Sequence, residues 1–207
     1  MTLDINNVQA YHITDIENLP GIFASGGLLS DLALGPTAHS VIGYSHIKQR
    51  RMTVLRVPCC TGQPFVGAFV PFYYCPRSPM LFTVNKGSTG KPAGCQGSIV
   101  HLVTNVSVLT SLGSEWAISD GNAGAAHALF ANSLTALKKL DWAAIRTSSW
   151  AQVMHQKAAE FLVRDFVPWN AVQSIGCFDA GAVAKVTALL TNTPHRPLVS
   201  VQRAWYY

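Results

Sequence analysis

Charged residues are scarce in this chain of 207 residues, and acidic residues are the scarcest of them. Only 12% of the residues are charged and 49% are hydrophobic, which permits one folded domain with a core and argues against a disordered tail. Just three glutamates occur, Glu17, Glu115 and Glu160, together with seven aspartates. An enzyme with this sequence that depends on a carboxylate therefore has few candidates for it.

Long apolar runs and paired cysteines are also missing. No run of about 18 consecutive apolar residues occurs, which argues against a membrane-spanning helix. The first residues, Met1 to Asn7, lack the basic start and the apolar run of a secretory signal. The five cysteines are odd in number and contain no C-x-x-C pair, which disfavours a disulfide framework or a zinc site. We expect reduced thiols, a cytoplasmic location, no metal and no contact with a membrane.

The common motifs for nucleotide, metal and acyl-transfer sites are absent as well. The stretch from Gly87 to Lys91 is similar to a phosphate-binding loop, but Asn85 and Pro92 stand where that motif needs glycine and Ser or Thr. Neither G-x-G-x-x-G, H-E-x-x-H nor G-x-S-x-G occurs. These absences argue against several familiar sites but identify no reaction.

Basic residues outnumber acidic ones, and several of them lie close together. The net charge is +5 and the sequence pI is near 9.1. Lys48, Arg50, Arg51 and Arg56 fall within nine positions that contain no acidic residue. Such a stretch forms either a solvated helix face or a surface that contacts phosphates, and the sequence leaves both interpretations open.

The chain shows no internal repeat, no low-complexity tract and no linker, so we expect one domain over residues 1–207. Patterns of apolar residues and turn formers predict strands and helices that mix without strict alternation, which indicates the α+β class. The predicted strands cover residues 10–13, 69–74, 98–103, 160–163, 175–178 and 198–201. One predicted helix begins after Asp15, and three more cover residues 41–51, 125–140 and 180–190. A short helix is predicted over 142–145, with Asp141 as its N-cap.

Five segments, taken in order, span nearly the whole chain. They read YHITDIENLPGI from Tyr11 with GGL from Gly26, IGYSHIKQRR from Ile42, VPFYYCPRSPML from Val70, QKAAEFLV from Gln156 and WYY from Trp205. Together they resemble the DarT family of DNA ADP-ribosyltransferases. The chain departs from the family at one place, because Gly67-Ala68-Phe69 stands where its members often have His-Asp-Tyr before Val-Pro-Phe.

The resemblance implies an α+β domain with the ADP-ribosyltransferase (PARP-like) fold, in which two facing β-sheets form an NAD⁺ cleft with helices around it. It implies a toxin that transfers ADP-ribose from NAD⁺ to a nucleobase and releases nicotinamide. Thymine is the favoured base, and guanine is the alternative. The DNA is single-stranded because the reacting edge of the base must be unpaired. The implied partner, besides single-stranded DNA, is a cognate ADP-ribosylglycohydrolase antitoxin similar to DarG.

Glu160 and Arg51 are the catalytic residues that the resemblance implies. Glu160 opens an apolar run, and without the family it is equally consistent with a surface carboxylate at a strand end. In the family, such a glutamate binds a ribose hydroxyl, stabilises positive charge as the glycosidic bond breaks and helps to take a proton from the nucleophile. A guanidinium binds pyrophosphate and stabilises a base that loses its proton, and we expect this of Arg51, not of Arg50.

The other expected site residues are histidine, aromatic, polar and basic. A lone strand histidine is usually structural, but the family's matching histidine holds an NAD⁺ ribose, as an imidazole can. Aromatic strand residues are usually core, although nicotinamide and an extruded base also stack on aromatic faces. The expected NAD⁺ contacts are His12, Thr14, Gly43, Tyr44, Arg51, Phe72 and Tyr73. The expected DNA contacts are Lys48, Arg50, Tyr74, Arg77, Ser78, Met80, Asp120 and Asn122, with residues 120–122 in a second substrate loop.

Two alternatives compete with DNA modification. The first is an NAD⁺ glycohydrolase or a protein ADP-ribosyltransferase on the same fold, which labelled NAD⁺ offered to DNA oligomers and to proteins would separate. The second is a catalytically inactive nucleic-acid-binding module. The presence of His12, Arg51 and Glu160 argues against the second alternative.

Overall fold

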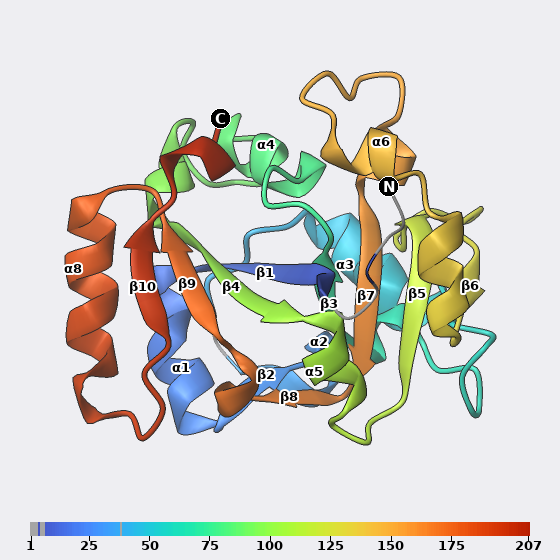
Figure 1. Cartoon of the computed structure of the whole chain (residues 1–207), viewed down its shortest axis with the longest axis horizontal. Helices are drawn as coiled ribbons and strands as arrows, with labels where there is room; N and C mark the ends of the chain where they lie inside the picture. Colours follow the sequence, from blue (N-terminus) through green and yellow to red (C-terminus); the bar gives the residue numbers. More distant parts are fainter. Residues whose placement is uncertain (1–3, 5–6, 38) are drawn as a thin grey trace.

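A mixed eight-stranded β-sheet runs through the molecule, with helices around it (Figure 1). The computed structural model describes residues 4, 7–37 and 39–207. In spatial order the strands are β10 (Leu198–Val201), β9 (Ser174–Cys177), β4 (Ile99–Asn105), β1 (Gln9–Asp15), β3 (Phe69–Tyr73), β7 (Ala159–Arg164), β5 (Trp116–Asn122) and β6 (Phe130–Ala131). A second sheet pairs β2 (Gly27–Leu29) with β8 (Phe166–Pro168).

The large sheet consists of two half-sheets that meet at one residue pair. β1 is paired with β4 along seven residues, and β3 is paired with β7 along five. Between β1 and β3, the described chain forms the single pair Tyr11 with Tyr73. We call the boundary between β1 and β3 the seam. The α+β class is confirmed, and the two predicted sheets are joined at the seam.

Short helices connect and cover the strands. The α-helices are α1 (Leu19–Ala24), α2 (Asp31–Leu34), α3 (Ser45–Thr53), α4 (Pro79–Asn85), α5 (Val106–Thr110), α6 (Trp142–Arg146), α7 (Met154–Lys157) and α8 (Ala180–Leu189). The 3-10 helices are η2 (Ile16–Asn18), η3 (Val66–Ala68), η4 (Cys95–Ser98), η5 (Leu134–Lys139), η6 (Trp169–Ala171), η7 (Leu190–Asn192) and η8 (Arg203–Trp205). None of the described helices is long and apolar enough to cross a membrane.

The exit from β1 shows how local residues set these elements. The Asp15 carboxylate accepts from the Glu17 amide and so starts η2, as the sequence predicts. Pro20 lies in the first turn of α1, where its missing N–H has no intrahelical partner to lose. Leu19 is fully buried, and Gly26 then adopts a positive φ of 75°, which glycine tolerates without strain.

The predicted helix over residues 125–140 is wrong. Phe130–Ala131 instead pair with β5 as strand β6, and only Leu134–Lys139 are helical, as the 3-10 helix η5. The side chain of Asp120 accepts from the amide of Leu129, which holds the chain in a turn before β6. Leu129 is 70% exposed, so the helical spacing of apolar residues here does not mark a buried face.

Two boundaries also differ from the prediction. The helix expected over 41–51 begins at Ser45, because Tyr44 has an extended backbone with φ −65° and ψ 126°. Residues 120–122, expected in a loop, form the irregular end of β5, where the register with β7 shifts after Ile118. The helix at 142–145 with its Asp141 cap and the six predicted strands are confirmed within a few residues at each end.

Candidate active site

An ion pair between Arg51 and Glu160 lies where β7 begins. Arg51 Nη1 and Nη2 donate to Glu160 Oε1 and Oε2 at 3.1 and 3.0 Å. The side chains are only 13% and 1% exposed. Helix α3 supplies the arginine and β7 the glutamate, although 109 residues separate them in the sequence. A planar guanidinium that engages both oxygens fixes the orientation of the carboxylate.

The end of β5 completes the surroundings of Glu160. The amide of Ala123 donates to Glu160 Oε1 at 3.0 Å, and the amide of Glu160 donates to Ser119 Oγ at 3.0 Å. Asn122 Oδ1 accepts from the amide of Gly124 at 2.8 Å and so shapes the turn that presents Ala123. A carboxylate has about four acceptor positions. The guanidinium and the Ala123 amide use three, which leaves one, on Oε2, for the hydroxyl of a ligand.

The charges in this pair are mutually stabilised. Burial acts to lower the pKa of Arg51, but the attraction of the Glu160 carboxylate outweighs it and the pKa is raised. Tyr73 faces Glu160 across β3 and β7, and burial together with that carboxylate raises the pKa of its phenol. Arg51 is therefore a cation at neutral pH and Tyr73 a neutral hydrogen-bonding group. Removing one partner of a buried ion pair typically costs about 3–5 kcal/mol.

His12 bridges the seam. Its Nδ1 lies 2.9 Å from the carbonyl oxygen of Pro71, which can only accept, so Nδ1 carries the proton. Burial lowers the pKa of His12, and the ring is neutral at physiological pH. Nε2 is then an acceptor for a ligand hydroxyl. The ring of Phe72 lies 5.7 Å from that of His12, but Phe72 is 1% exposed and belongs to the core, not to an open stacking face.

Asn18 ties β1 to the chain that enters α3. Its Nδ2 donates to Thr14 Oγ1 at 3.1 Å and to the Ser40 carbonyl at 2.9 Å, and its Oδ1 accepts from the Ser40 amide at 2.7 Å. Tyr44 lies just before α3, with its ring 5.3 Å from that of His46. Two of the expected NAD⁺ contacts, Thr14 and Tyr44, are thus held on segments that Asn18 joins.

Three further residues of the expected set lie around α4. Gly43 lies against Met80, since a Cβ atom at position 43 would be 2.7 Å from Met80 Cε. Ser78 is fully buried, and its hydroxyl accepts from the amide of Leu81 to cap α4. The prediction that Ser78 lies on an open, DNA-facing loop is therefore wrong for its side chain, which is used inside the protein.

The basic stretch does not form one free cationic surface. Lys48 pairs with Asp31 at 2.9 Å, and Arg51 is held by Glu160. Arg56 lies over the ring of Phe65, with its Cζ 4.2 Å from the centroid. Arg50 is exposed and has no side-chain partner in the described part of the chain. As the helical rotation predicts, the adjacent arginines of α3 point different ways.

The remaining expected DNA contacts divide into two groups. Tyr74 meets Trp142 edge to face at 5.5 Å, and the Arg77 guanidinium lies 4.6 Å from the centroid of the Tyr207 ring. Both line an open cavity. Asp120 and Asn122 instead use their side chains to hold the end of β5, and Asp120 also faces His155 at 3.5 Å.

The sequence gives no direct signal for three contributors to this site. Ser119 and Ala123 bind Glu160 through a hydroxyl and a main-chain amide, and neither residue type marks a site by itself. Gly67, which departs from the family pattern, packs against α3, since a Cβ atom there would lie 2.8 Å from Met52 Cγ and 3.2 Å from the carbonyl oxygen of Arg51. Among the residues that the structure describes, no group of three or more His, Cys, Asp or Glu could hold a metal ion.

The split sheet, the neutral histidine across its seam and the buried arginine–glutamate pair fit an ADP-ribosyltransferase-type α+β enzyme. A comparison with family models gives the particular family. The model for DarT, described as an ssDNA thymidine ADP-ribosyltransferase, matches residues 11–207. The chain belongs to the DarT family, and it is a DNA ADP-ribosyltransferase.

Individual relatives agree with this assignment. A DNA ADP-ribosyl transferase of Thermus aquaticus is 40% identical over 199 residues, which cover 95% of this chain and 88% of the relative. Thermus sp. 2.9 DarT in complex with ADP-ribosylated ssDNA superimposes with a TM-score of 0.90 at 36% identity, covering 97% of this chain and 96% of the other. The same Thermus protein in complex with NAD⁺ gives a TM-score of 0.87 at 32% identity, with both chains covered completely.

Proposed function

We propose that this chain transfers ADP-ribose from NAD⁺ to thymine in single-stranded DNA, with Glu160, Arg51 and His12 acting on NAD⁺. The observation that carries this assignment is the bidentate ion pair, which aligns Glu160 and leaves one acceptor position free on Oε2. A hydroxyl of the nicotinamide ribose donates to that position. The Thermus sp. 2.9 relative was solved with NAD⁺ and with ADP-ribosylated ssDNA, which supports both substrates here.

Glu160 assists the departure of nicotinamide. As the bond between the ribose C1′ and the nicotinamide nitrogen breaks, its electron pair leaves with nicotinamide and positive charge develops on the ribose. A carboxylate already fixed beside the ribose stabilises that charge without reorganising during the reaction. Because Glu160 is 1% exposed, water screens this interaction little.

Arg51 assists the attacking base. The imide nitrogen of thymine forms the new bond to C1′ and loses its proton to the ribose hydroxyl bound at Oε2, which passes its own proton to Glu160. Negative charge builds on the base carbonyls while the proton leaves. A guanidinium has five N–H donors, and the Glu160 pair uses two, so three remain to stabilise the base. The family description names thymidine, which favours thymine over guanine as the acceptor.

His12 positions the NAD⁺ ribose through Nε2, since Nδ1 is committed to Pro71. Thr14, Gly43 and Tyr44 remain the proposed neighbours of NAD⁺ on the segments beside it. For the DNA, the exposed Arg50 is the proposed phosphate contact on α3, because it alone of the basic stretch lacks a side-chain partner in the described chain.

The cellular role that follows from this chemistry is that of a toxin acting on DNA in the cytoplasm. The N-glycosidic bond that it forms can be hydrolysed, so a cognate ADP-ribosylglycohydrolase similar to DarG is the proposed antitoxin. The described cysteines are all free thiols, which is consistent with a reducing compartment.

Mass spectrometry of nucleosides tests the proposal. Single-stranded oligonucleotides that contain or lack thymine are incubated with the protein and NAD⁺ and then digested. ADP-ribosylated thymidine is the expected product, and nicotinamide release should depend on added DNA. Nicotinamide release without DNA would identify a glycohydrolase, and label on added protein alone would identify a protein ADP-ribosyltransferase.

A further inference from the structure

A buried lysine without an acidic partner lies next to a cysteine. Lys157, the last residue of α7, is only 2% exposed. In the described part of the chain its Nζ contacts the Ile145 carbonyl at 2.9 Å and Cys75 Sγ at 3.6 Å, and no carboxylate pairs with it. Buried lysines are normally paired with an acid, so the surroundings of this one are unusual.

A structural role accounts for only one of the two contacts of Lys157. Ile145 lies in the last turn of α6, where carbonyl groups lack partners within the helix and a cation is stabilising. Capping α6 in this way does not require a thiol on the other side of the ammonium group. Cys75, in the loop that follows β3, is the one side chain that Nζ contacts in the described chain.

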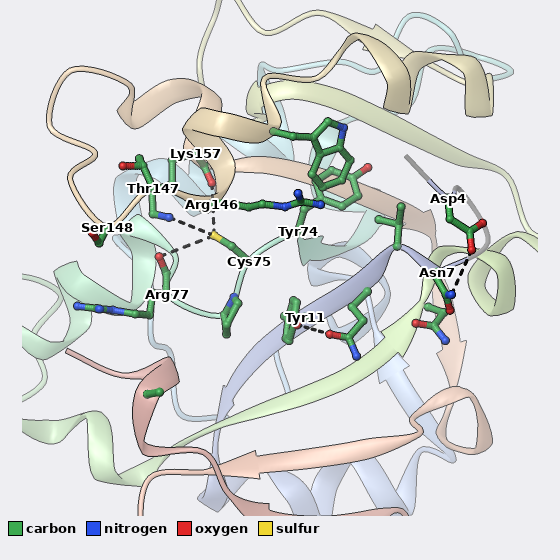
Figure 2. Close-up of a pocket in the computed structure, with 16 residues that line it drawn as sticks. Asp4, Asn7, Tyr11, Tyr74, Cys75, Arg77, Arg146, Thr147, Ser148 and Lys157 are labelled. Atoms are coloured by element: carbon green, nitrogen blue, oxygen red, sulfur yellow. Dashed lines mark hydrogen bonds between the residues drawn. The ribbon is translucent and has the colours of Figure 1, made fainter. Parts of the chain in front are cut away.

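Both side chains line an open cavity of about 910 Å³. Figure 2 shows the Cys75 sulfur in the wall of this cavity, with dashed lines to Lys157 and Arg77. The cavity is far larger than the roughly 30 Å³ that a water molecule occupies in the liquid. Hydrogen peroxide, which is similar in size to water, can therefore reach the sulfur although Cys75 is only 6% exposed.

The lysine also affects the reactivity of the thiol. Burial raises the pKa of Cys75, and the positive charge of Lys157 opposes that rise. Because the thiolate is the form that peroxide oxidises, the lysine increases the reactive fraction. The other contacts of Cys75 Sγ are main-chain carbonyls, those of Arg77 at 3.7 Å and Lys157 at 3.8 Å. The Lys157 amine is thus the nucleophile placed to react with an oxidised Cys75.

We propose that hydrogen peroxide joins Cys75 to Lys157 by a covalent S–N bond. Peroxide first oxidises the thiol to a sulfenic acid, as its O–O bond breaks and one water leaves. Nζ gives one proton to the solvent in the cavity, and its electron pair attacks Sγ. The S–O bond breaks, and the oxygen leaves as a second water with its own proton and one from Nζ. Sulfur has then lost the two electrons that peroxide gained.

The bond cross-links two segments that are 82 residues apart in the sequence, the loop after β3 and the end of α7. A cross-link that closes so long a loop stabilises a protein mainly by restricting the unfolded chain. It also removes a buried positive charge. The melting temperature of the oxidised protein should therefore rise by about 5–10 °C. Dithiothreitol should reverse the rise, because its thiolate attacks the sulfur and releases the amine.

Peptide mass spectrometry after treatment with hydrogen peroxide tests the proposal. The expected product joins the peptides that contain Cys75 and Lys157, with the loss of two hydrogens, and trypsin no longer cleaves after Lys157. Lys157→Gln should stop the reaction at the sulfenic acid, which dimedone then labels. Cys75→Ser should give neither product. In both variants, peroxide should leave the melting temperature without the rise seen in the wild-type protein.

Cys95 and Lys91 provide a comparison within the same chain. Burial raises the pKa of Cys95 and Lys91 opposes the rise, but Lys91 Nζ is held by Asp15 at 2.6 Å, so no cross-link should form there. Cys95→Ser is therefore the matched control, and it should keep both the product and the temperature shift. Sulfenic or sulfinic acid at Cys75 of the wild-type protein, without a cross-link, would overturn the proposal. A cross-linked product heavier by one oxygen would contradict the direct S–N bond.

Discussion

The Glu160 carboxylate receives three hydrogen bonds inside the protein, two from Arg51 and one from Ala123. Glu160→Gln keeps the shape of the side chain but removes the charge that would stabilise the ribose. We expect transfer to fall by at least about 10²–10³-fold, the usual cost of losing one preorganised electrostatic contact, and by more if proton transfer is also lost. Nucleoside mass spectrometry measures the product.

Glu115→Gln is the matched control for this substitution. Glu115 is a half-exposed glutamate that pairs with Arg164, and it takes no part in the site. Its replacement should leave transfer unchanged. Wild-type activity in Glu160→Gln, or equal losses in both variants, would contradict the role assigned to Glu160.

Arg51 and Arg50 are adjacent but differ in their surroundings. Successive residues of a helix are rotated by about 100°, so Arg51 reaches Glu160 while Arg50 stays exposed. Arg51→Ala should lose most of the transfer activity, and Arg51→Lys should recover only part, because an ammonium cannot engage both carboxylate oxygens. Arg50→Ala should mainly weaken DNA binding, with a salt slope lower by about 0.7. An inactive Arg50→Ala beside a normal Arg51→Ala would reverse the assignment.

At the scale of single elements, the position of helix α3 depends on the glycine at residue 67, against which the helix packs. A methyl group there would lie 2.8 Å from Met52 Cγ, 3.0 Å from Met52 Cα and 3.2 Å from the Arg51 carbonyl oxygen. Gly67→Ala should therefore lower the free energy of unfolding by about 1–3 kcal/mol and reduce transfer, because α3 moves and carries Arg51 with it. Urea denaturation and the transfer assay measure the two effects.

Gly21→Ala provides the comparison for this substitution. Gly21 lies in α1 with no atom within 4 Å of an added Cβ. Alanine is the better helix former there, so stability should rise by about 0.5–1 kcal/mol. A Gly67→Ala protein as stable and active as Gly21→Ala would show that α3 tolerates the added methyl group.

The strands were predictable from sequence where they are buried apolar runs, as in β4 and β7. The helix predicted over 125–140 is wrong because strand pairing overrides the helical spacing of the apolar residues. Phe130–Ala131 pair with the edge of β5, and the Asp120 side chain holds the turn before them. For the candidate site, the family resemblance predicts Arg51 and Glu160 as site residues. It does not predict the ion pair between them, which forms only when the chain folds. The hydrogen bond from the Ala123 amide could not be predicted from the sequence, because every residue except proline carries a backbone N–H.

At the scale of the whole molecule, His101 makes stability depend on pH. It is fully buried between Tyr206 and Trp205, its Nε2 donates to the Pro76 carbonyl, and burial lowers its pKa to about 4 from 6.5. Between these values the unfolded chain binds the proton and the folded chain does not. Stability should therefore fall as the pH drops below 6.5, by about 3 kcal/mol in total near pH 4.

Urea denaturation between pH 7 and pH 4 measures this dependence. His101→Gln, which keeps a neutral donor for the Pro76 carbonyl, should be less stable than wild type at pH 7 but lose less stability on acidification. His46→Gln, at an exposed histidine, should follow the wild-type curve. Parallel curves for wild type and His101→Gln would assign the acid sensitivity to other groups, such as His12, whose pKa is also lowered by burial.

The seam has a consequence for the motions of the free protein. In the described chain β1 and β3 are joined by one strand pair, Tyr11 with Tyr73, and by the His12–Pro71 hydrogen bond, so the half-sheets can separate locally while each keeps its own ladder. If NAD⁺ binds His12 on one side and Glu160 on the other, as the proposed function requires, it acts as a removable cross-link between them. Deuterium uptake by the amides of β1 and β3 should then slow when NAD⁺ binds, whereas uptake in β9, away from the seam, should change little. The substrate would in this way complete a sheet that the polypeptide leaves open.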